Sequence, residues 1–178
     1  SGAGTVQSAL LVMPVVLLSL AALTKAAQMP FHTWLLGAMV APTPTSALLH
    51  SSTMVKAGVF LMVKLSPLYA IYPVTGFMVT SVGAITFLLA ALMAISQSNA
   101  KRVLAYSTIS NLGLISACLG VGAPEAVWAA IFLILFHTVA KSLLFLCVGT
   151  AEHHIGSRNI DTLRSEERFS RNAETAVV

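Results

Sequence analysis

Five titratable side chains lie inside strongly apolar stretches of this sequence: Lys25, His50, Lys56, His137 and Lys141. A charged lysine at the centre of a bilayer costs about 2.5–3.5 kcal/mol, so residues of this kind are rare there unless they serve a function. Burial favours the neutral amine, which accepts a proton, and a neutral imidazole both donates and accepts one. These residue types therefore predict proton transfer within a membrane.

Their spacing indicates which of them share a helix face. His137 and Lys141 are four residues apart and lie on one face of a helix. His50 and Lys56 are six apart, about 240° around a regular helix, so they line one channel only if the backbone between them is locally unwound. Lys25 precedes Pro30, where we expect a helix break, and irregular backbone at membrane depth typically lines a cavity.

Counter-charges are missing from the predicted spans. The acidic residues fall in turns or in the polar C-terminal segment, and they are Glu125, Glu152, Asp161, Glu166, Glu167 and Glu174. The buried lysines must therefore be neutral, solvated by internal water, or paired with an acid outside this chain. Snorkelling to the interface is the better interpretation for Lys64, near a helix end, but it fails for Lys141, well inside its predicted helix. Lys101, in a polar turn, is interpreted as a topology residue.

The composition places the chain in a membrane. Hydrophobic residues make up 57% of the 178 residues and charged residues 9%, against about 25% charged in soluble domains. The net charge of +4 comes from scattered residues and forms no face for nucleic acid. Cys118 and Cys147 are interpreted as packing residues, and a metal site of Cys147 with His153 and His154 is disfavoured because the three have no fixed ligand spacing.

We predict an all-α, polytopic transmembrane helix bundle. About five spans are expected, and they cover residues 7–36, 45–65, 72–96, 103–120 and 126–150. The first should break between Lys25 and Pro30, and a second irregular segment is expected between His50 and Thr53. Residues 1–151 would form the bundle, and residues 152–178 a polar loop or tail.

Basic residues set the expected orientation. Residues 97–102, residues 152–178 and the connector from Pro42 to Pro44 share one side, which the positive-inside rule makes cytoplasmic. The chain would then lie in the cell (inner, cytoplasmic) membrane. Ser1 to Val6 lacks an initiator methionine, so a part of a longer protein is expected.

Several motifs together resemble the antiporter-like proton-translocating subunits of respiratory complex I, Mrp-type sodium/proton antiporters and energy-converting hydrogenases. They are KAAQMPFHTWL from Lys25, APTP from Ala41, SALLHS from Ser46, MVKAG from Met54, KRVLAYST from Lys101 and HTVAKSLLF from His137. Within this superfamily, SQSNAK from Ser96 and PEAVW from Pro124 are most similar to the large membrane subunit of Ech-type hydrogenases.

The resemblance implies a proton path along the membrane midplane. Lys25 would be the central switching lysine, His50 and Lys56 would follow it, and His137 and Lys141 would continue the axis. Lys101 and His32, which lie in matching motifs, would be secondary site residues. The family pairs its first lysine with a glutamate on an earlier helix, outside this chain. Three positions depart from the family: Leu36-Gly37 replaces Pro-Asp, and Val40 stands where an acid is common.

The resemblance further implies a proton-translocating subunit of a redox-driven pump, such as an energy-converting hydrogenase or a complex I-like NADH–quinone oxidoreductase. Its proton transport would be either linked to sodium transport or independent of it. The chain would be a transport subunit with no cofactor, metal or redox centre of its own. Its partners would be other membrane subunits and, through them, a peripheral iron–sulfur hydrogenase or dehydrogenase arm. The alternatives are a component of an Mrp-type multisubunit antiporter and a non-transporting fragment.

Overall fold

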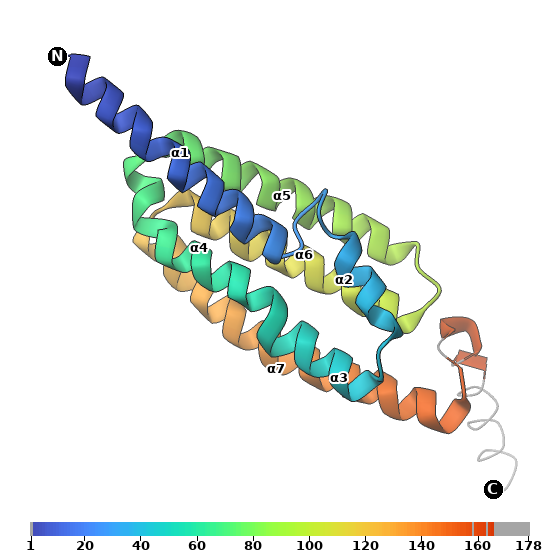
Figure 1. Ribbon diagram of the computed structural model, residues 1–178. Coiled ribbons are helices and arrows are strands. Elements are labelled where there is room, and N and C mark those ends of the chain that lie inside the picture. Colours follow the sequence, from blue (N-terminus) through green and yellow to red (C-terminus); the bar gives the residue numbers. More distant parts are fainter. Residues whose placement is uncertain (1, 158, 163, 166–178) are drawn as a thin grey trace, which may run out of the picture.

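The computed structural model describes residues 2–157, 159–162 and 164–165, which form an elongated bundle of helices (Figure 1). Its elements are α1 (Gly2–Lys25), α2 (Thr33–Gly37), the 3-10 turn η1 (Ala38–Val40), α3 (Thr43–Leu48), the π-helical turn η2 (Leu49–Thr53), α4 (Met54–Ile71), α5 (Pro73–Ile95), α6 (Ala100–Val121) and α7 (Pro124–Ile155). Within the described residues, α4 to α7 are each long and apolar enough to cross a membrane, and Val12–Lys25 of α1 forms a shorter apolar helix. The prediction of an all-α polytopic bundle is confirmed.

The predicted helix break between Lys25 and Pro30 is present. α1 ends at Lys25, and the chain is irregular until α2 begins at Thr33. Ala27 has a positive φ of 52°, and the Met29–Pro30 peptide bond is cis. The break lies midway along the bundle, where a backbone end would be costly in lipid. It is anchored to α5, because the amide nitrogen of Met29 donates a hydrogen bond of 3.1 Å to Oγ1 of Thr86.

The second predicted irregularity is also present, as the π-helical turn η2 at Leu49–Thr53. A π-turn closes its hydrogen bonds from residue i to i+5 and so carries one residue more per turn than an α-helix. This extra residue changes the relative direction of the side chains before and after it. His50 within η2 and Lys56 in α4 consequently both contact α7.

α4 does not end at Ser66 and Pro67, where the sequence led us to expect its end; it continues to Ile71. Pro67 has no backbone N–H to donate to the carbonyl of Val63, one turn earlier. The hydroxyl of Ser66 donates to that carbonyl oxygen instead, at 2.8 Å. The serine therefore satisfies the acceptor that the proline leaves free, and the helix passes through.

α6 and α7 are longer than predicted because their capping residues lie outside the apolar runs. Asn99 caps α6, its side-chain oxygen accepting hydrogen bonds from the amides of Lys101 and Arg102 at 3.0 and 3.3 Å. α7 continues to Ile155, beyond the expected end near residue 150, and stops at Gly156, whose φ of 73° suits a C-terminal cap.

α5 and α6 are packed through glycines that face each other. A Cβ added at Gly83 would lie 2.7 Å from the carbonyl oxygen of Gly113, and one added at Gly113 would lie 2.7 Å from that of Gly83. Gly76 and Gly120 repeat this arrangement about two turns away. Such close backbone approach is typical of helix pairs in membranes, where small residues replace the hydrophobic effect as the basis of packing.

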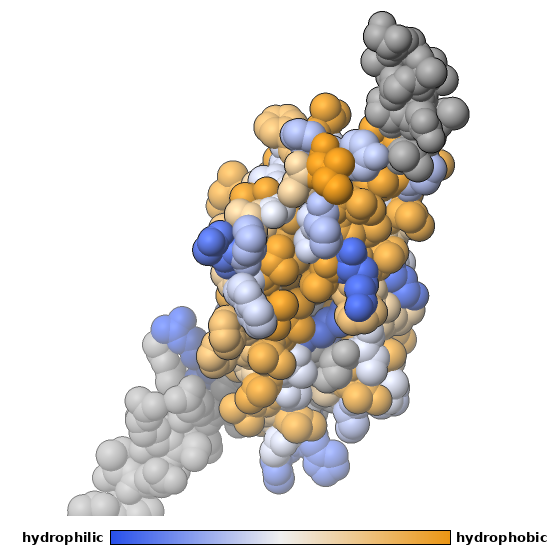
Figure 2. Space-filling model, turned by 90° about the vertical axis from the view of Figure 1, so that its left-hand side faces the viewer, coloured by the Kyte–Doolittle hydropathy of each residue, from blue (hydrophilic) through white to orange (hydrophobic). Residues whose placement is uncertain are grey.

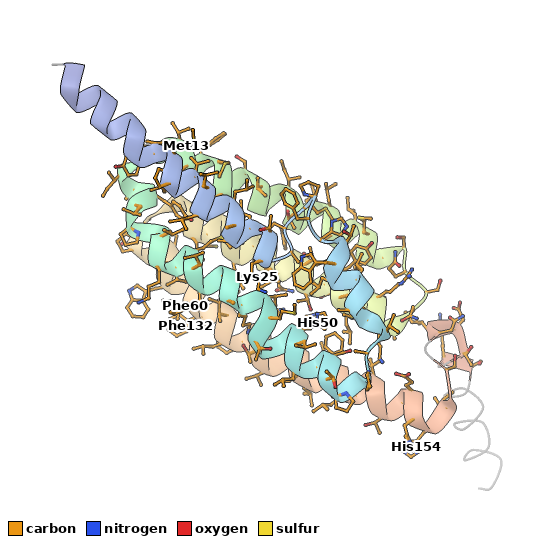
Figure 3. The ribbon with its side chains drawn as sticks, viewed as in Figure 1. Met13, Lys25, His50, Phe60, Phe132 and His154 are labelled. Carbon is orange, nitrogen blue, oxygen red and sulfur yellow. The ribbon has the colours of Figure 1, made fainter. Side chains whose placement is uncertain are left out.

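The outer surface of the bundle is apolar. Figure 2 shows one side covered largely by hydrophobic side chains, with hydrophilic ones in small patches. Phe60 of α4 and Phe132 of α7 point outward on one face, and they are 62% and 55% exposed (Figure 3). A surface of this kind matches a lipid or protein environment rather than water. The chain is therefore part of a multi-pass membrane protein.

The described parts of the three segments predicted to share one side of the membrane lie at one end of the bundle; residues 158, 163 and 166–178 of the predicted tail lie outside the described residues. The amide nitrogen of Ile160 donates a hydrogen bond of 2.9 Å to the carbonyl oxygen of Ser98, which places the segment after α7 beside the turn before α6. Pro44, at the start of α3, lines a cavity together with the C-terminal end of α7.

Candidate functional site

The site is built around one face of α7. The buried residues of this helix, as far as its side chains are described, are Ala130, His137, Lys141 and Phe145. The last three follow one another at intervals of four, so they lie in a row along the helix. The predicted shared face of His137 and Lys141 is confirmed, and it points into the bundle.

Lys141 is 4% exposed and joins α7 to α6. Its Nζ atom donates a hydrogen bond of 2.6 Å to Oγ of Ser107. A hydroxyl gives a buried amine a partner in either protonation state, because it both accepts and donates hydrogen bonds. Lys141 therefore has a polar partner inside the bundle.

Lys56 reaches the same helix from α4. Its Nζ atom donates to the carbonyl oxygen of Ile134 at 2.9 Å and also contacts Oγ1 of Thr138. Thr138 in turn donates a hydrogen bond of 2.7 Å to Ile134. The amine of Lys56 is thereby fixed one turn before Lys141 along α7.

His137 lies between these two lysines. It is 6% exposed, and it lies within electrostatic reach of both Lys56 and Lys141. Neither ring nitrogen has a hydrogen-bond partner in the described part of the chain. A buried imidazole without fixed partners keeps both nitrogens free to donate or accept a proton.

His50 extends the group toward α3. It is 1% exposed, and its ring stacks on Phe145 with 5.6 Å between ring centroids and 17° between ring planes. Its two nitrogens also have no hydrogen-bond partner among the described residues. Because Phe145 follows Lys141 by one turn, His50 lies next to the row on α7, and Figure 3 shows it inside the bundle.

Lys25 differs from the prediction that it is buried: it is exposed on the surface of the chain. α1 packs on α4 through Ala22 and Ala26, since a Cβ added at Gly58 would lie 2.5 and 2.6 Å from their backbone atoms. Lys25 lies between these two residues in the sequence, and its side chain stays exposed beside the contact. It lines a shallow depression of about 490 Å³ with Trp34 and other residues, at the end of α1 (Figure 3).

Lys101 also differs from its prediction as a topology residue in a polar turn. It lies in the first turn of α6 and is only 1% exposed. Its Nζ atom forms an ion pair of 3.1 Å with Oε2 of Glu152, near the end of α7. Lys101 is thus buried with a carboxylate partner on α7, which its interpretation as a topology residue did not predict.

His32 is half-buried at the start of α2, and its ring lies 6.3 Å from that of Tyr106 on α6. The row on α7 thus brings together Lys56, His137, Lys141 and His50, whereas Lys25, His32 and Lys101 make separate contacts. In the part of the chain that the structure describes, no three histidine, cysteine or acidic side chains lie close enough together to hold a metal ion.

Three contributing residues were not singled out from the sequence: Ser107, Thr138 and Glu152. The signal for Glu152 was its spacing, because it follows Lys141 by eleven residues, or about three turns, and so lies on the same face of α7. Thr138 adjoins His137 in sequence. Nothing in the local sequence indicates that Ser107 faces Lys141 on another helix.

Most of the chain matches known proteins. Residues 3–170 match the family described as NADH:quinone oxidoreductase/Mrp antiporter, TM. A probable K⁺/H⁺ antiporter protein of Rhizobium meliloti (strain 1021) is 51% identical over 148 residues, which are 83% of this chain and 15% of that protein. The "Putative antiporter subunit mnhA2" of Staphylococcus aureus (strain MRSA252) is 43% identical over 169 residues, 87% of this chain and 21% of that protein. The chain thus spans about a fifth or less of these relatives.

Two solved membrane complexes contain the same fold. A chain of the Mrp complex from Dietzia sp. DQ12-45-1b has a TM-score of 0.78 and 45% identity, with 81% of this chain and 16% of that chain covered. A chain of the membrane-bound sulfane sulfur reductase, an archaeal respiratory membrane complex, has a TM-score of 0.74 and 26% identity, with 83% and 31% covered. The chain therefore belongs to the NADH:quinone oxidoreductase/Mrp antiporter transmembrane family, whose members include antiporter-like subunits of multisubunit membrane complexes.

Proposed function

We propose that this chain contributes a proton-conducting segment to an Mrp-type multisubunit antiporter that exchanges a monovalent cation for protons. The observation that carries the proposal is the row on α7. The amines of Lys56 and Lys141 and the imidazoles of His50 and His137 lie along this face of α7, in a bundle with an apolar surface. The nitrogens of both imidazoles have no hydrogen-bond partner among the described residues.

The chemistry follows from these contacts. A proton arriving at Lys56 passes to His137 on one nitrogen while the other nitrogen releases a proton to Lys141, so the imidazole ends neutral after each transfer. Ser107 holds the amine of Lys141 in place, and Thr138 does the same for Lys56. His50 extends the path beyond Lys141, and a proton that enters at the His50 end passes through the same groups in reverse. Each step moves one proton and changes no covalent bond between heavy atoms.

Lys25 has a separate role in this proposal. It lies at the helix break and is exposed on the surface of the chain, so it would exchange protons with groups that do not belong to the described part of this chain. His32 and Lys101 remain secondary members of the path.

The relatives support an antiporter better than a hydrogenase or another redox-driven pump. The two antiporter proteins are 51% and 43% identical to this chain, and the Mrp complex chain is 45% identical, whereas the sulfur reductase chain is 26% identical. The partners are then other membrane proteins of the antiporter. The end that carries residues 97–102 would face the cytoplasm, as its basic residues favour.

A redox-driven pump is the second candidate function. Its support is the family itself, which includes NADH:quinone oxidoreductases, and the fold shared with the respiratory sulfur reductase complex. In that case a peripheral iron–sulfur arm would drive transport. The row on α7 would conduct protons in the same way.

Transport by the intact complex in proteoliposomes decides between the two. For an antiporter, an imposed Na⁺ or K⁺ gradient alone moves protons, as read by an internal pH dye. For a redox pump, protons move only when an electron donor such as NADH is supplied. Replacing Lys141 with Met should abolish proton movement in either case while the complex still assembles on a native gel; transport at the wild-type rate by that variant would overturn the proton-path assignment.

A further inference from the structure

A cavity of about 590 Å³ opens at the end of α7 that lies beyond the expected membrane core. α7 has 32 residues and is about 48 Å long, whereas the hydrocarbon core of a bilayer is about 30 Å thick. The cavity is formed where this protruding end meets the start of α3. Its walls include Pro44, Leu146 and three titratable residues, Glu152, His153 and His154; Figure 3 shows His154 at this end of the bundle.

Glu152 connects this cavity to the interior. It lines the cavity with a side chain that is 21% exposed, and it forms the 3.1 Å ion pair with Lys101, whose side chain is 1% exposed. One member of the pair therefore faces the cavity and the other is enclosed by protein. A buried ammonium group without a counter-charge would be costly, and the carboxylate of Glu152 supplies that counter-charge.

An apolar layer lies between this ion pair and Lys141, since Phe145 stands between Lys141 and Glu152 on α7. Its members are Met39, Ala47, Leu104, Ala105 and Phe145. Leu104 and Ala105 follow Lys101 by one turn of α6, and Ser107, the partner of Lys141, lies just beyond them. The ring of His50 stacks on Phe145 and so lies at the level of this layer.

We propose that the cavity is the aqueous mouth of the proton path, that Glu152 is the residue exchanging protons with it, and that Lys101 and His50 carry the proton across the apolar layer to Lys141. This inference rests on the proposed function, and it adds a residue and an opening that the row on α7 lacks.

Entry through Glu152 and Lys101 takes three proton transfers. A hydronium ion in the cavity gives one proton to the carboxylate of Glu152 and becomes water. Lys101, now without a counter-charge, gives one proton inward to a free nitrogen of His50. The carboxylic acid of Glu152 then transfers its proton to the neutral amine of Lys101, which restores the ion pair. One proton has entered from the cavity and one has moved inward.

The first test compares variants of the intact complex in proteoliposomes. Glu152→Gln keeps the shape of the side chain and removes its ability to take up a proton, so cation-driven proton transport should fall at least tenfold. Glu152→Asp should retain part of the activity, because a carboxylate remains. The matched control is Glu125→Gln, which removes an exposed acid from the opposite end of the same helix and should transport normally.

A charge swap separates proton transfer from simple stabilisation. The double variant Lys101→Glu with Glu152→Lys keeps an ion pair between α6 and α7, so the complex should assemble and keep its thermal stability. It places the lysine in the cavity and the acid inside, and transport should stay at least tenfold below wild type. Full recovery of transport by the swapped pair would show that the pair only holds the helices together and would overturn the proposal.

A chemical probe tests the mouth directly. In a background with Cys118→Ser and Cys147→Ser, Thr150→Cys lines the cavity and Leu143→Cys lies on the outer face of α7. A membrane-impermeant trimethylammonium-ethyl thiosulfonate should modify the cysteine at 150 and inhibit transport, and leave the one at 143 unmodified. No modification at 150, or modification without inhibition, would overturn the assignment of the cavity as the mouth.

Lys141→Met, measured in parallel, separates the assignment of the mouth from that of the path. If that variant is inactive while Glu152→Gln transports at the wild-type rate, the mouth is assigned wrongly but the path on α7 stands. If both variants transport normally, the proposed function itself fails.

Discussion

Lys141 on α7 and Ser107 on α6 are joined by a hydrogen bond of 2.6 Å, although 34 residues separate them in the sequence. The bond fixes the position of a buried amine relative to a helix that is itself packed tightly on α5 through facing glycines. The amine is therefore held by the most closely packed helix pair of the bundle, and it lies one turn from His137 and one turn from Phe145.

Replacing Ser107 with Ala removes the partner of Lys141 and leaves the buried amine without a hydrogen bond. An unsatisfied buried polar group costs about 1–3 kcal/mol, and about 1.4 kcal/mol corresponds to a tenfold change in rate. We expect proton transport to fall about tenfold in proteoliposomes. Ser116→Ala is the control, because that hydroxyl donates only within α6, to Leu112 at 2.8 Å; equal losses in both variants would contradict the role of Ser107.

Lys141→Arg keeps the positive charge at this position but removes the ability to release a proton, since a guanidinium group stays protonated in proteins. We expect transport as low as that of Lys141→Met, with assembly of the complex unchanged on a native gel. Transport close to wild type would show that Lys141 contributes only a fixed charge.

Gly113→Ala should destabilise the pair of α5 and α6. The added Cβ would lie 2.6 Å from the backbone nitrogen of Phe87 and 2.7 Å from the carbonyl oxygen of Gly83, so the helices must separate. Overpacking of this kind costs about 1–3 kcal/mol. A thermal-shift measurement on the purified complex should show a lower melting temperature.

Gly37→Ala is the matched control for that substitution. A Cβ at Gly37 would meet nothing within 4 Å, and the residue lies at the end of the short helix α2. The melting temperature should be unchanged or slightly raised, because alanine restricts the unfolded chain more than glycine does. A loss as large as that of Gly113→Ala would mean that the close helix contact is not the cause.

Thr86→Val should loosen the helix break. It removes the hydroxyl that accepts the 3.1 Å hydrogen bond from the amide of Met29, and no helix supplies another partner for that amide. We expect faster amide exchange across residues 26–32 by mass spectrometry and partial loss of transport. Thr86→Ser keeps the hydroxyl and should behave like the wild type; identical exchange in both variants would argue against this anchor.

Local chemistry made parts of the fold predictable. Pro30 indicated the break after α1, and the four-residue spacing of His137 and Lys141 indicated their common face. The continuation of α4 through Pro67 was missed, although the compensating hydroxyl of Ser66 is its immediate neighbour.

The burial of individual lysines could not be predicted in the same way. Lys25 and Lys101 were assigned from their position along the chain, yet burial depends on which face of a helix meets which neighbour. α1 packs on α4 through Ala22 and Ala26, which turns Lys25 outward, and α6 packs on α7 at Glu152, which encloses Lys101.

α7 is one unbroken helix from Pro124 to Ile155, and it carries His137, Lys141, Phe145 and Glu152. Backbone hydrogen bonds fix the spacing and the angles between these four side chains along its length. A small rotation or sliding of this helix would therefore change the partners of all four side chains at the same time. The ion pair of Glu152 with Lys101 and the hydrogen bond of Lys141 with Ser107 are therefore coupled through the rigid helix, over about three helical turns.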